Sequence, residues 1–205
     1  MEDLTTGFQS YNKIPRLARQ MIITEKIDGT NAQVYIAHEV DLLPGMEEHA
    51  VAHSIDDRLH MFAGSRKRWI QPGRQKDNAG FAAFVFDYAH ELFELGPGRH
   101  YGEWWGQGIR RGYNQEEKHF SLFNSARWTH NERPECCGVV PVLYEGDFNT
   151  FTCDEVMEDL RLSGSQAALG YDKPEGIVVF HKQANLLFKK TFEMDGQGKG
   201  VDKAD

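Results

Sequence analysis

One lysine stands where it could act as a nucleophile. Lys26 follows the apolar segment Met21–Thr24 and precedes Asp28-Gly29, a pair typical of turns. A free lysine amine has a pKa near 10.4, so it attacks an electrophile only where burial or neighbouring cations favour the neutral form. The pattern Lys-x-Asp-Gly is weak on its own, because about one chain in twenty of this size contains it by chance.

Four later segments combine charged and large apolar or aromatic residues in strand-like sequence. They are Tyr101–Gly106 with Glu103, Lys118–Asn124 with Phe120, Pro174–Val179 with Glu175, and Leu186–Lys190 with Lys189 and Lys190. Buried strands rarely hold charges unless these are paired or functional. The carboxylates and lysines of these segments are therefore candidates for a polar site that includes Lys26.

The elements that must position these residues are mostly short strands. Strands are predicted, from alternating or continuous apolar residues, over residues 21–24, 32–37, 61–70, 101–105, 120–123, 139–144, 176–181 and 186–192. A helix is predicted over 78–95, with Asp77 or Asn78 as its cap and Gly96-Pro97 at its end. A second helix is expected from Thr152 or Asp154 to Leu162. Many strands with few helices predict an α+β domain with an antiparallel core sheet.

Length and composition indicate an ordinary globular protein. The chain has 205 residues, of which 40% are hydrophobic and 26% charged, enough for one full domain. We expect residues 1–193 to form this domain and residues 194–205, rich in Gly, Lys and Asp, to be a disordered tail.

Several features favour a soluble protein of the reducing cytoplasm. No apolar run is long enough to cross a membrane, and the first residues lack the features of a signal peptide. The three cysteines, Cys136, Cys137 and Cys153, are odd in number and contain no Cys-x-x-Cys pair. A disulfide framework or a structural zinc site is therefore not expected.

The net charge of −8 argues against a general nucleic-acid coat protein, because phosphate binding needs a cationic surface. Local basic clusters remain at Arg66–Arg68, Arg74 with Lys76, Arg110-Arg111, and Lys182 with Lys189-Lys190. A solvated surface explains any one of these clusters equally well. Nucleic-acid binding, if present, must therefore use a local surface.

Taken together, the segments around Lys26, Glu103, Phe120, Glu175 and Lys189 resemble the covalent nucleotidyltransferase superfamily of DNA ligases, RNA ligases and capping enzymes. The RNA ligase branch is the most similar, and the resemblance runs from about Ile22 to Glu193. It implies an α+β fold: an antiparallel-sheet nucleotidyltransferase domain of the ATP-grasp-like ligase adenylation type, with flanking helices. Because only about a dozen residues follow Glu193, no OB-fold domain is expected after it.

The resemblance implies an ATP-dependent RNA ligase that uses Mg²⁺ or Mn²⁺. Lys26 would attack the α-phosphate of ATP to form lysyl-AMP. AMP would then pass to a 5′-phosphate RNA end, which a 3′-hydroxyl would attack to seal the strand. The alternatives are a DNA nick ligase, an enzyme that only adenylates 5′ ends, and a catalytically inactive nucleotide- or RNA-binding module.

Four roles around the phosphates and the sugar follow from the resemblance. Lys189 would contact the α-phosphate, and Glu175 would position the metal ion through water. Glu103 would hold a ribose hydroxyl. Arg66, in Gly64-Ser65-Arg66, would touch the ribose or the RNA end.

The remaining roles concern the base and the turn. Phe120 would stack on the adenine, and Glu25 would accept a hydrogen bond from the adenine amino group. Because guanine presents an acceptor at that place, Glu25 favours ATP over GTP. Asp28 and Gly29 would set the turn that aims Lys26.

The last segment departs from the family, which usually has two lysines separated by one residue. Here Lys189 and Lys190 are adjacent, and Thr191 occupies the other position. Neighbouring residues of a regular strand point to opposite faces, so only one of the two lysines can face the nucleotide. We expect Lys189 to do so, because it follows Leu187-Phe188 in the family's manner.

Overall fold

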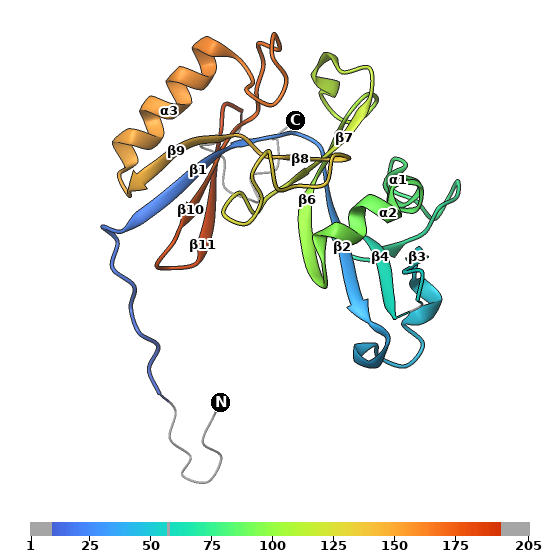
Figure 1. Ribbon diagram of the computed structural model, residues 1–205. Coiled ribbons are helices and arrows are strands. Elements are labelled where there is room, and N and C mark those ends of the chain that lie inside the picture. Colours follow the sequence, from blue (N-terminus) through green and yellow to red (C-terminus); the bar gives the residue numbers. More distant parts are fainter. Residues whose placement is uncertain (1–9, 57, 194–205) are drawn as a thin grey trace, which may run out of the picture.

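Two β-sheets, each covered by helices on one face only, form the frame of the molecule (Figure 1). The computed structural model describes residues 10–56 and 58–193. The four-stranded sheet has the order β11 (Leu186–Thr191), β10 (Gly176–His181), β1 (Gln20–Lys26) and β9 (Val142–Asp147). All its pairs are antiparallel.

The seven-stranded sheet holds the larger core. Its order is β3 (Ala52–His53), β4 (Leu59–Ser65), β2 (Thr30–His38), β6 (Gly98–Gly106), β7 (Lys118–Leu122) and β8 (Cys137–Val139), and β5 (Trp69–Ile70) pairs with β4. Only the pair of β7 with β8 is parallel. One face packs its apolar side chains against α1 (Phe81–Asp87) and α2 (Ala89–Leu92).

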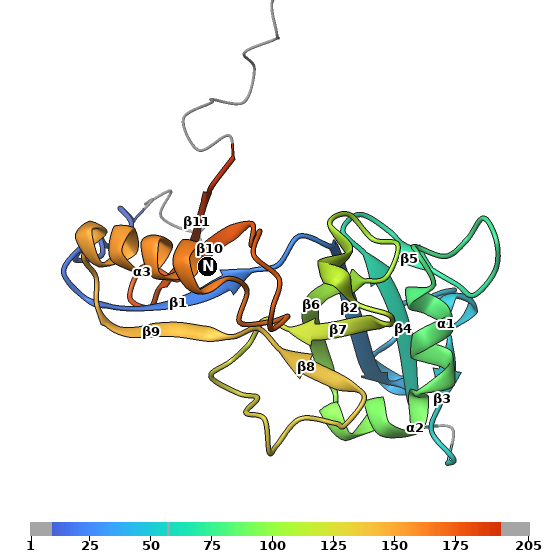
Figure 2. The same ribbon diagram turned by 90° about the horizontal axis from the view of Figure 1, so that it is seen from above.

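The four-stranded sheet is covered by one longer helix, α3 (Thr150–Ser163). Asn149 caps this helix, since its side chain accepts a hydrogen bond from the Phe151 amide at 2.9 Å. The helix packs on Met21, Ile23 and Ile177 of the sheet. Figure 2 shows α3 and the α1–α2 pair at opposite ends of the molecule, with both sheets between them. The uncovered face of each sheet is therefore turned away from its own helices.

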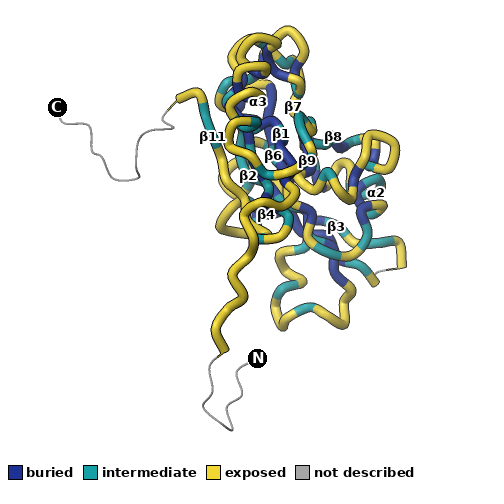
Figure 3. The backbone as a smooth tube through the Cα atoms, turned by 90° about the vertical axis from the view of Figure 1, so that its left-hand side faces the viewer, coloured by how far each residue is buried: buried dark blue, intermediate teal, exposed yellow. Residues whose placement is uncertain are grey.

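A three-residue turn carries the chain from one sheet to the other. β1 ends at Lys26 and β2 begins at Thr30. Gly29 lies so close to β6 that an added Cβ would stand 2.5 Å from the Trp104 carbonyl oxygen. Only glycine fits this approach. Figure 3 shows that burial follows the strands through this junction, while the connecting segments are largely exposed.

The prediction of many strands with few helices is confirmed, but three predicted elements are divided. The strand predicted over 61–70 is β4 and β5, separated by an exposed turn over residues 66–68. The strand predicted over 139–144 is β8 and β9, with Pro141, which lacks an amide donor, between them. The helix predicted over 78–95 is α1, α2 and the 3-10 turn η3 (Phe93–Leu95).

Gly80 occupies the N-cap position of α1, but the side chain of Asp77 binds free amides of its first turn, as predicted. The Asp77 carboxylate accepts hydrogen bonds from the amides of Ala82 at 2.7 Å and Ala83 at 3.1 Å. The remaining short turns are η1 (Glu39–Asp41), η2 (Glu47–His49) and η4 (Gly112–Asn114). The tail expected over 194–205 lies outside the described residues. Within the described part of the chain, no helix is both long and apolar enough to cross a bilayer.

Candidate active site

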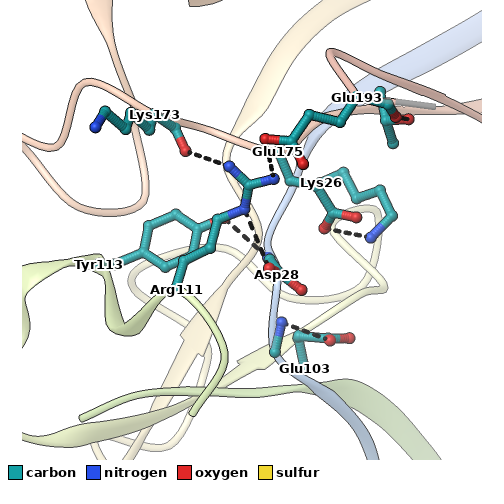
Figure 4. Close-up of polar contacts among 10 residues, drawn as sticks. Lys26, Asp28, Glu103, Arg111, Tyr113, Lys173, Glu175 and Glu193 are labelled. Carbon is teal, nitrogen blue, oxygen red and sulfur yellow. Dashed lines mark hydrogen bonds and ion pairs between the residues drawn. The ribbon is translucent and has the colours of Figure 1, made fainter. Parts of the chain in front are cut away.

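Lys26 and Glu175 form the centre of the site. The Lys26 Nζ donates a hydrogen bond to the Glu175 Oε2 at 2.5 Å, and the two side chains are 22% and 18% exposed (Figure 4). The strands explain the contact, because Lys26 at the end of β1 lies opposite Gly176 at the start of β10. The predicted nucleophile and the predicted metal-positioning carboxylate are thus brought together by register.

Glu103 reaches this pair from the other sheet. Its Oε1 accepts a hydrogen bond from the Gly29 amide at 3.1 Å. Burial raises the pKa of Glu103 to about 7, while the Lys26 charge and the Gly29 amide oppose the rise and the charges of Glu175 and Asp28 add to it. The uncovered faces of the two sheets therefore meet at a cluster of one lysine and three carboxylates.

The raised pKa of Glu103 predicts a pH-dependent stability. Between the ordinary value near 4.5 and about 7, the folded protein keeps a proton that the unfolded chain has lost, so stability falls as pH rises through this window. Glu103→Gln is expected to gain on the order of 2 kcal/mol relative to wild type between about pH 5 and about pH 8. Urea denaturation at both pH values measures this difference.

The control for that comparison is Glu94→Gln, which removes an exposed carboxylate from η3. A Glu103→Gln protein whose stability tracks that of wild type at both pH values would show that the Glu103 carboxylate ionises normally in the fold.

Arg111, a member of the predicted basic cluster Arg110-Arg111, holds the turn next to Lys26 in place. Its Nε donates to the Asp28 Oδ2 at 3.1 Å, and its two terminal nitrogens reach the Lys173 carbonyl and the Glu193 Oε1, each at 3.3 Å (Figure 4). The Tyr113 hydroxyl accepts a hydrogen bond from the Asp28 amide at 2.8 Å. Asp28 is thus held by two side chains from the segment after β6.

The register of β10 and β11 assigns the two lysines to different faces. Thr24 lies opposite Val178, and Val178 lies opposite Lys189. Directly opposed residues share a face of the sheet. Lys189 is therefore on the face of Thr24 and Lys26, as expected from the strand period.

Lys190, named with Lys189 as a candidate for the polar site that includes Lys26, is a first correction, because it lies on the other face of the sheet. Its Nζ forms an ion pair with Asp154 of α3, on the opposite face of the sheet. Strand alternation is the physical reason, because Lys190 turns away wherever Lys189 turns toward Lys26. Thr191, not a second lysine, follows Lys189 on the face of Lys26, opposite Gly176.

A second expectation, that Glu25 contacts the adenine, is not met. The Glu25 carboxylate accepts hydrogen bonds from the Ser165 hydroxyl at 2.6 Å and from the amides of Gln166 at 2.7 Å and Ala167 at 2.8 Å. Glu25 is 1% exposed, and burial raises its pKa although the three hydrogen bonds oppose the rise. The carboxylate anchors the loop after α3, and both of its oxygens already accept hydrogen bonds from that loop. Glu25 therefore gives no reason to prefer ATP over GTP.

This anchoring role predicts a large loss of stability in Glu25→Ala. The substitution leaves buried donors of residues 165–167 without an acceptor, and each such loss costs about 1–3 kcal/mol. The free energy of unfolding, measured by urea denaturation, is expected to fall by about 2–4 kcal/mol. Glu155→Ala, at an exposed position of α3, is the matched control. Equal stability of the two variants would contradict the anchoring role.

A third expectation, that Phe120 stacks on the adenine, is not met. The Phe120 side chain is 0% exposed and packs with Phe81 and Trp104 under α1, so it has no open face for an adenine ring. Phe123, three residues later, is 40% exposed. Its amide donates to the Tyr101 carbonyl, which places Phe123 beside Tyr101 on the face that carries Glu103. An alternation count along this segment, Phe120-Ser121-Leu122-Phe123, could have separated the two aromatics.

Arg66 lies near the site but makes no ion pair with any described residue. It follows Ser65, which lies opposite Ala32, so it stands at the same end of the sheet as Asn31 and its partner Glu103. Its side chain is exposed. The position leaves Arg66 available to an anionic ligand that also contacts Glu103.

The donors at the site fit a metal ion that is held jointly with phosphate. Among the residues that the structure describes, no three His, Cys, Asp or Glu side chains form a group able to bind a metal by themselves. Mg²⁺ commonly binds through one or two carboxylates together with water and substrate phosphates. The Glu175 carboxylate, partly exposed beside Lys26, suits this mode of binding.

Comparison with known proteins identifies the family of the chain. A family model described as RNA ligase matches residues 19–191. The chain belongs to the RNA ligase family. The matched range begins before β1 and ends with β11, so it includes every strand that carries the site of this RNA ligase family member. No individual curated protein sequence gives a significant match.

Solved structures of RNA ligase mutants from Naegleria gruberi share the fold. One, with ATP and Mn, has a TM-score of 0.56 and 16% identity over 88% of this chain and 52% of that chain. Another, with AMP and Mn, has a TM-score of 0.54 and 16% identity over 85% of this chain and 50% of that chain. The chain spans about half the length of these RNA ligases.

Proposed function

We propose that this chain is the adenylation domain, predicted over residues 1–193, of an ATP-dependent RNA ligase. The observation that carries the proposal is the contact between Lys26 and Glu175 at 2.5 Å, with Glu103 beside it and Lys189 on the same sheet face. The contact supports the proposal because the sequence assigns both residues to the same chemistry although they are about 150 positions apart.

In the proposed first step, the Lys26 amine attacks the α-phosphorus of ATP. A nitrogen–phosphorus bond forms, the bond from the α-phosphorus to the bridging oxygen breaks, and pyrophosphate leaves with the electron pair, while the amine releases a proton to solvent. Glu175 orients the amine through the hydrogen bond it already accepts. The Lys189 ammonium lies on the face where negative charge develops, an arrangement that lowers the energy of the transition state.

The nucleoside part of ATP would lie toward the seven-stranded sheet. We assign Glu103 to a ribose hydroxyl and Phe123, instead of Phe120, to stacking on the adenine, since both lie on the uncovered face of that sheet. Mg²⁺ or Mn²⁺ would be held by Glu175 together with the phosphates. Its positive charge would offset the negative charge of the triphosphate.

In the later steps, AMP would move from Lys26 to the 5′-phosphate of an RNA end, and a 3′-hydroxyl would displace AMP to join the strands. Arg66, exposed at the edge of the site, would bind the incoming phosphate or ribose. The ATP- and AMP-bound structures of the Naegleria gruberi enzyme support the choice of nucleotide.

Incubation with α-labelled ATP and Mg²⁺, followed by denaturation, tests the proposal. Label is expected on the polypeptide and is expected to move to 5′-phosphorylated RNA when this is added. Nicked duplexes with RNA or DNA on either side of the break then separate an RNA ligase from a DNA ligase. Absence of label would leave a nucleotide-binding module without the chemistry.

A matched pair of lysine variants tests the assignment of the last strand. Lys189→Ala is expected to lower the rate of protein labelling by about 10-fold or more, because it removes a charge from the phosphate side of the sheet. Lys190→Ala removes the same charge from the α3 side and is expected to change the rate by less than about 2-fold. The reverse order of effects would show that Lys190 contacts the phosphates.

A further inference from the structure

The uncovered face of the seven-stranded sheet extends well beyond Glu103. Register places three rows of side chains on it. The row of Asn31, Glu103 and Ser121 borders the candidate active site, the row of Gln33, Tyr101 and Phe123 follows, and the row of Phe62, Tyr35 and Arg99 lies farthest away. Aromatic and basic side chains therefore continue the surface that begins at the ribose-binding position.

The farthest row is built around a stacked group. The rings of Tyr35 and Trp69 lie 5.9 Å apart with an angle of 18° between their planes. The Arg99 guanidinium lies 4.0 Å above the Tyr35 ring centroid, and its Nη1 donates to the Gln33 Oε1 at 3.2 Å. These contacts fix the position of the Arg99 guanidinium over the ring, and the residue is exposed to solvent.

Packing alone does not explain this surface. Tyr35 and Trp69 do cover Phe62, which is 0% exposed. Tyr101, however, is 47% exposed, and its ring contacts no other aromatic ring among the described residues. It stands between the stacked group and Glu103, on the same strand as both Arg99 and Glu103.

The positive charge of this surface favours an anionic ligand. Arg99 lies on this face, and Arg66 and Arg68 lie in the exposed turn that leads into Trp69. These three arginines border the aromatic rings in a chain whose net charge is −8. Aromatic rings and guanidinium planes that are flanked by positive charge bind the bases and the backbone of single-stranded nucleic acid.

We infer that Tyr35, Trp69, Arg99 and Tyr101 form a stacking platform for unpaired bases of the RNA strand whose end is placed at Lys26. The inference rests on the proposed RNA ligase function and extends it, because it names single-stranded RNA ends as the substrate class. A base-paired strand cannot use the platform, since its bases are already stacked within the duplex.

Binding of a dye-labelled, single-stranded RNA with a 5′-phosphate, followed by fluorescence anisotropy without ATP, tests the platform. Tyr101→Ala and Arg99→Ala are each expected to weaken binding by about 5-fold or more. Tyr101→Phe keeps the ring and is expected to restore it. Tyr88→Ala is the matched control, because Tyr88 is 45% exposed but follows α1 on the opposite side of the sheet, and its effect is expected to stay below about 2-fold.

Intrinsic fluorescence gives a second measurement. Trp104, Trp105 and Trp128 are buried, whereas Trp69 is partly exposed on the platform. Single-stranded RNA is expected to quench the emission, and Trp69→Phe is expected to abolish the quenching. Unchanged emission in the wild type would mean that the face is reserved for another partner, such as a protein segment, and would overturn the platform.

Labelling by ATP separates the platform from the proposed function. If wild type and Tyr101→Ala are both labelled by ATP, and the two proteins also bind RNA equally well, the platform is wrong and the ligase proposal stands. If neither is labelled, the ligase proposal fails, while the anisotropy series still decides on the platform. Equal weakening for blunt duplex RNA would overturn the role of unpaired bases.

Discussion

Lys26→Ala is expected to abolish transfer of label from α-labelled ATP to the protein, the largest effect that the site predicts. The amine is the atom that forms the bond to phosphorus, and no described side chain near Glu175 offers another amine directed at this carboxylate. The loss should therefore be complete within the detection limit of the gel.

A structural failure must be distinguished from this chemical one. Lys26 lies at the end of β1 and its side chain is partly exposed, so its removal is expected to shift the unfolding midpoint by only a few degrees. Label that persists in Lys26→Ala would show that another residue accepts AMP.

Glu175→Ala is expected to lower the rate of labelling by about 100-fold or more. The substitution removes the acceptor that orients the Lys26 amine and the carboxylate that we assign to the metal ion. Its cost is expected in the rate of chemistry, because Glu175 precedes β10 and is only partly buried. Single-turnover labelling at saturating ATP measures this rate.

The chain offers a matched control for this substitution. Glu145 of β9 accepts a hydrogen bond from the Lys182 Nζ at 2.6 Å, and its side chain is 56% exposed. Glu145→Ala thus breaks a lysine–glutamate pair of similar length in the same sheet, away from Lys26, and should leave labelling unchanged. Equal rates for the two variants, or a loss of several kcal/mol of stability in Glu175→Ala, would mean that Glu175 supports the fold instead of the reaction.

The sequence predicts the class of fold because the period of its apolar residues is a local property. The β1 and β10 strands and the contact of Asp77 with the first turn of α1 follow from residues a few positions apart. The division of the strand predicted over 61–70 does not follow, since Trp69 and Ile70 turn back to pair with β4. Pairing between strands is a tertiary property that local propensity does not encode.

The site, too, could be predicted only as far as local sequence patterns reach. Lys26, Glu103, Glu175 and Lys189 were predicted, because a charge in an apolar strand is visible in the sequence. The sequestration of Glu25 depends on a loop about 140 positions away, at Ser165–Ala167, which the sequence does not connect to β1. Arg111 was visible only as part of a basic pair, and its contact with Asp28 depends on how the segment after β6 folds back.

The most direct test of the central claim locates the AMP. Wild-type protein is incubated with ATP and Mg²⁺, digested, and analysed by mass spectrometry. We expect one AMP adduct, on the Nζ of Lys26, that disappears when pyrophosphate is added before digestion. An adduct on any other residue, or an unmodified protein after incubation at saturating ATP, would contradict it.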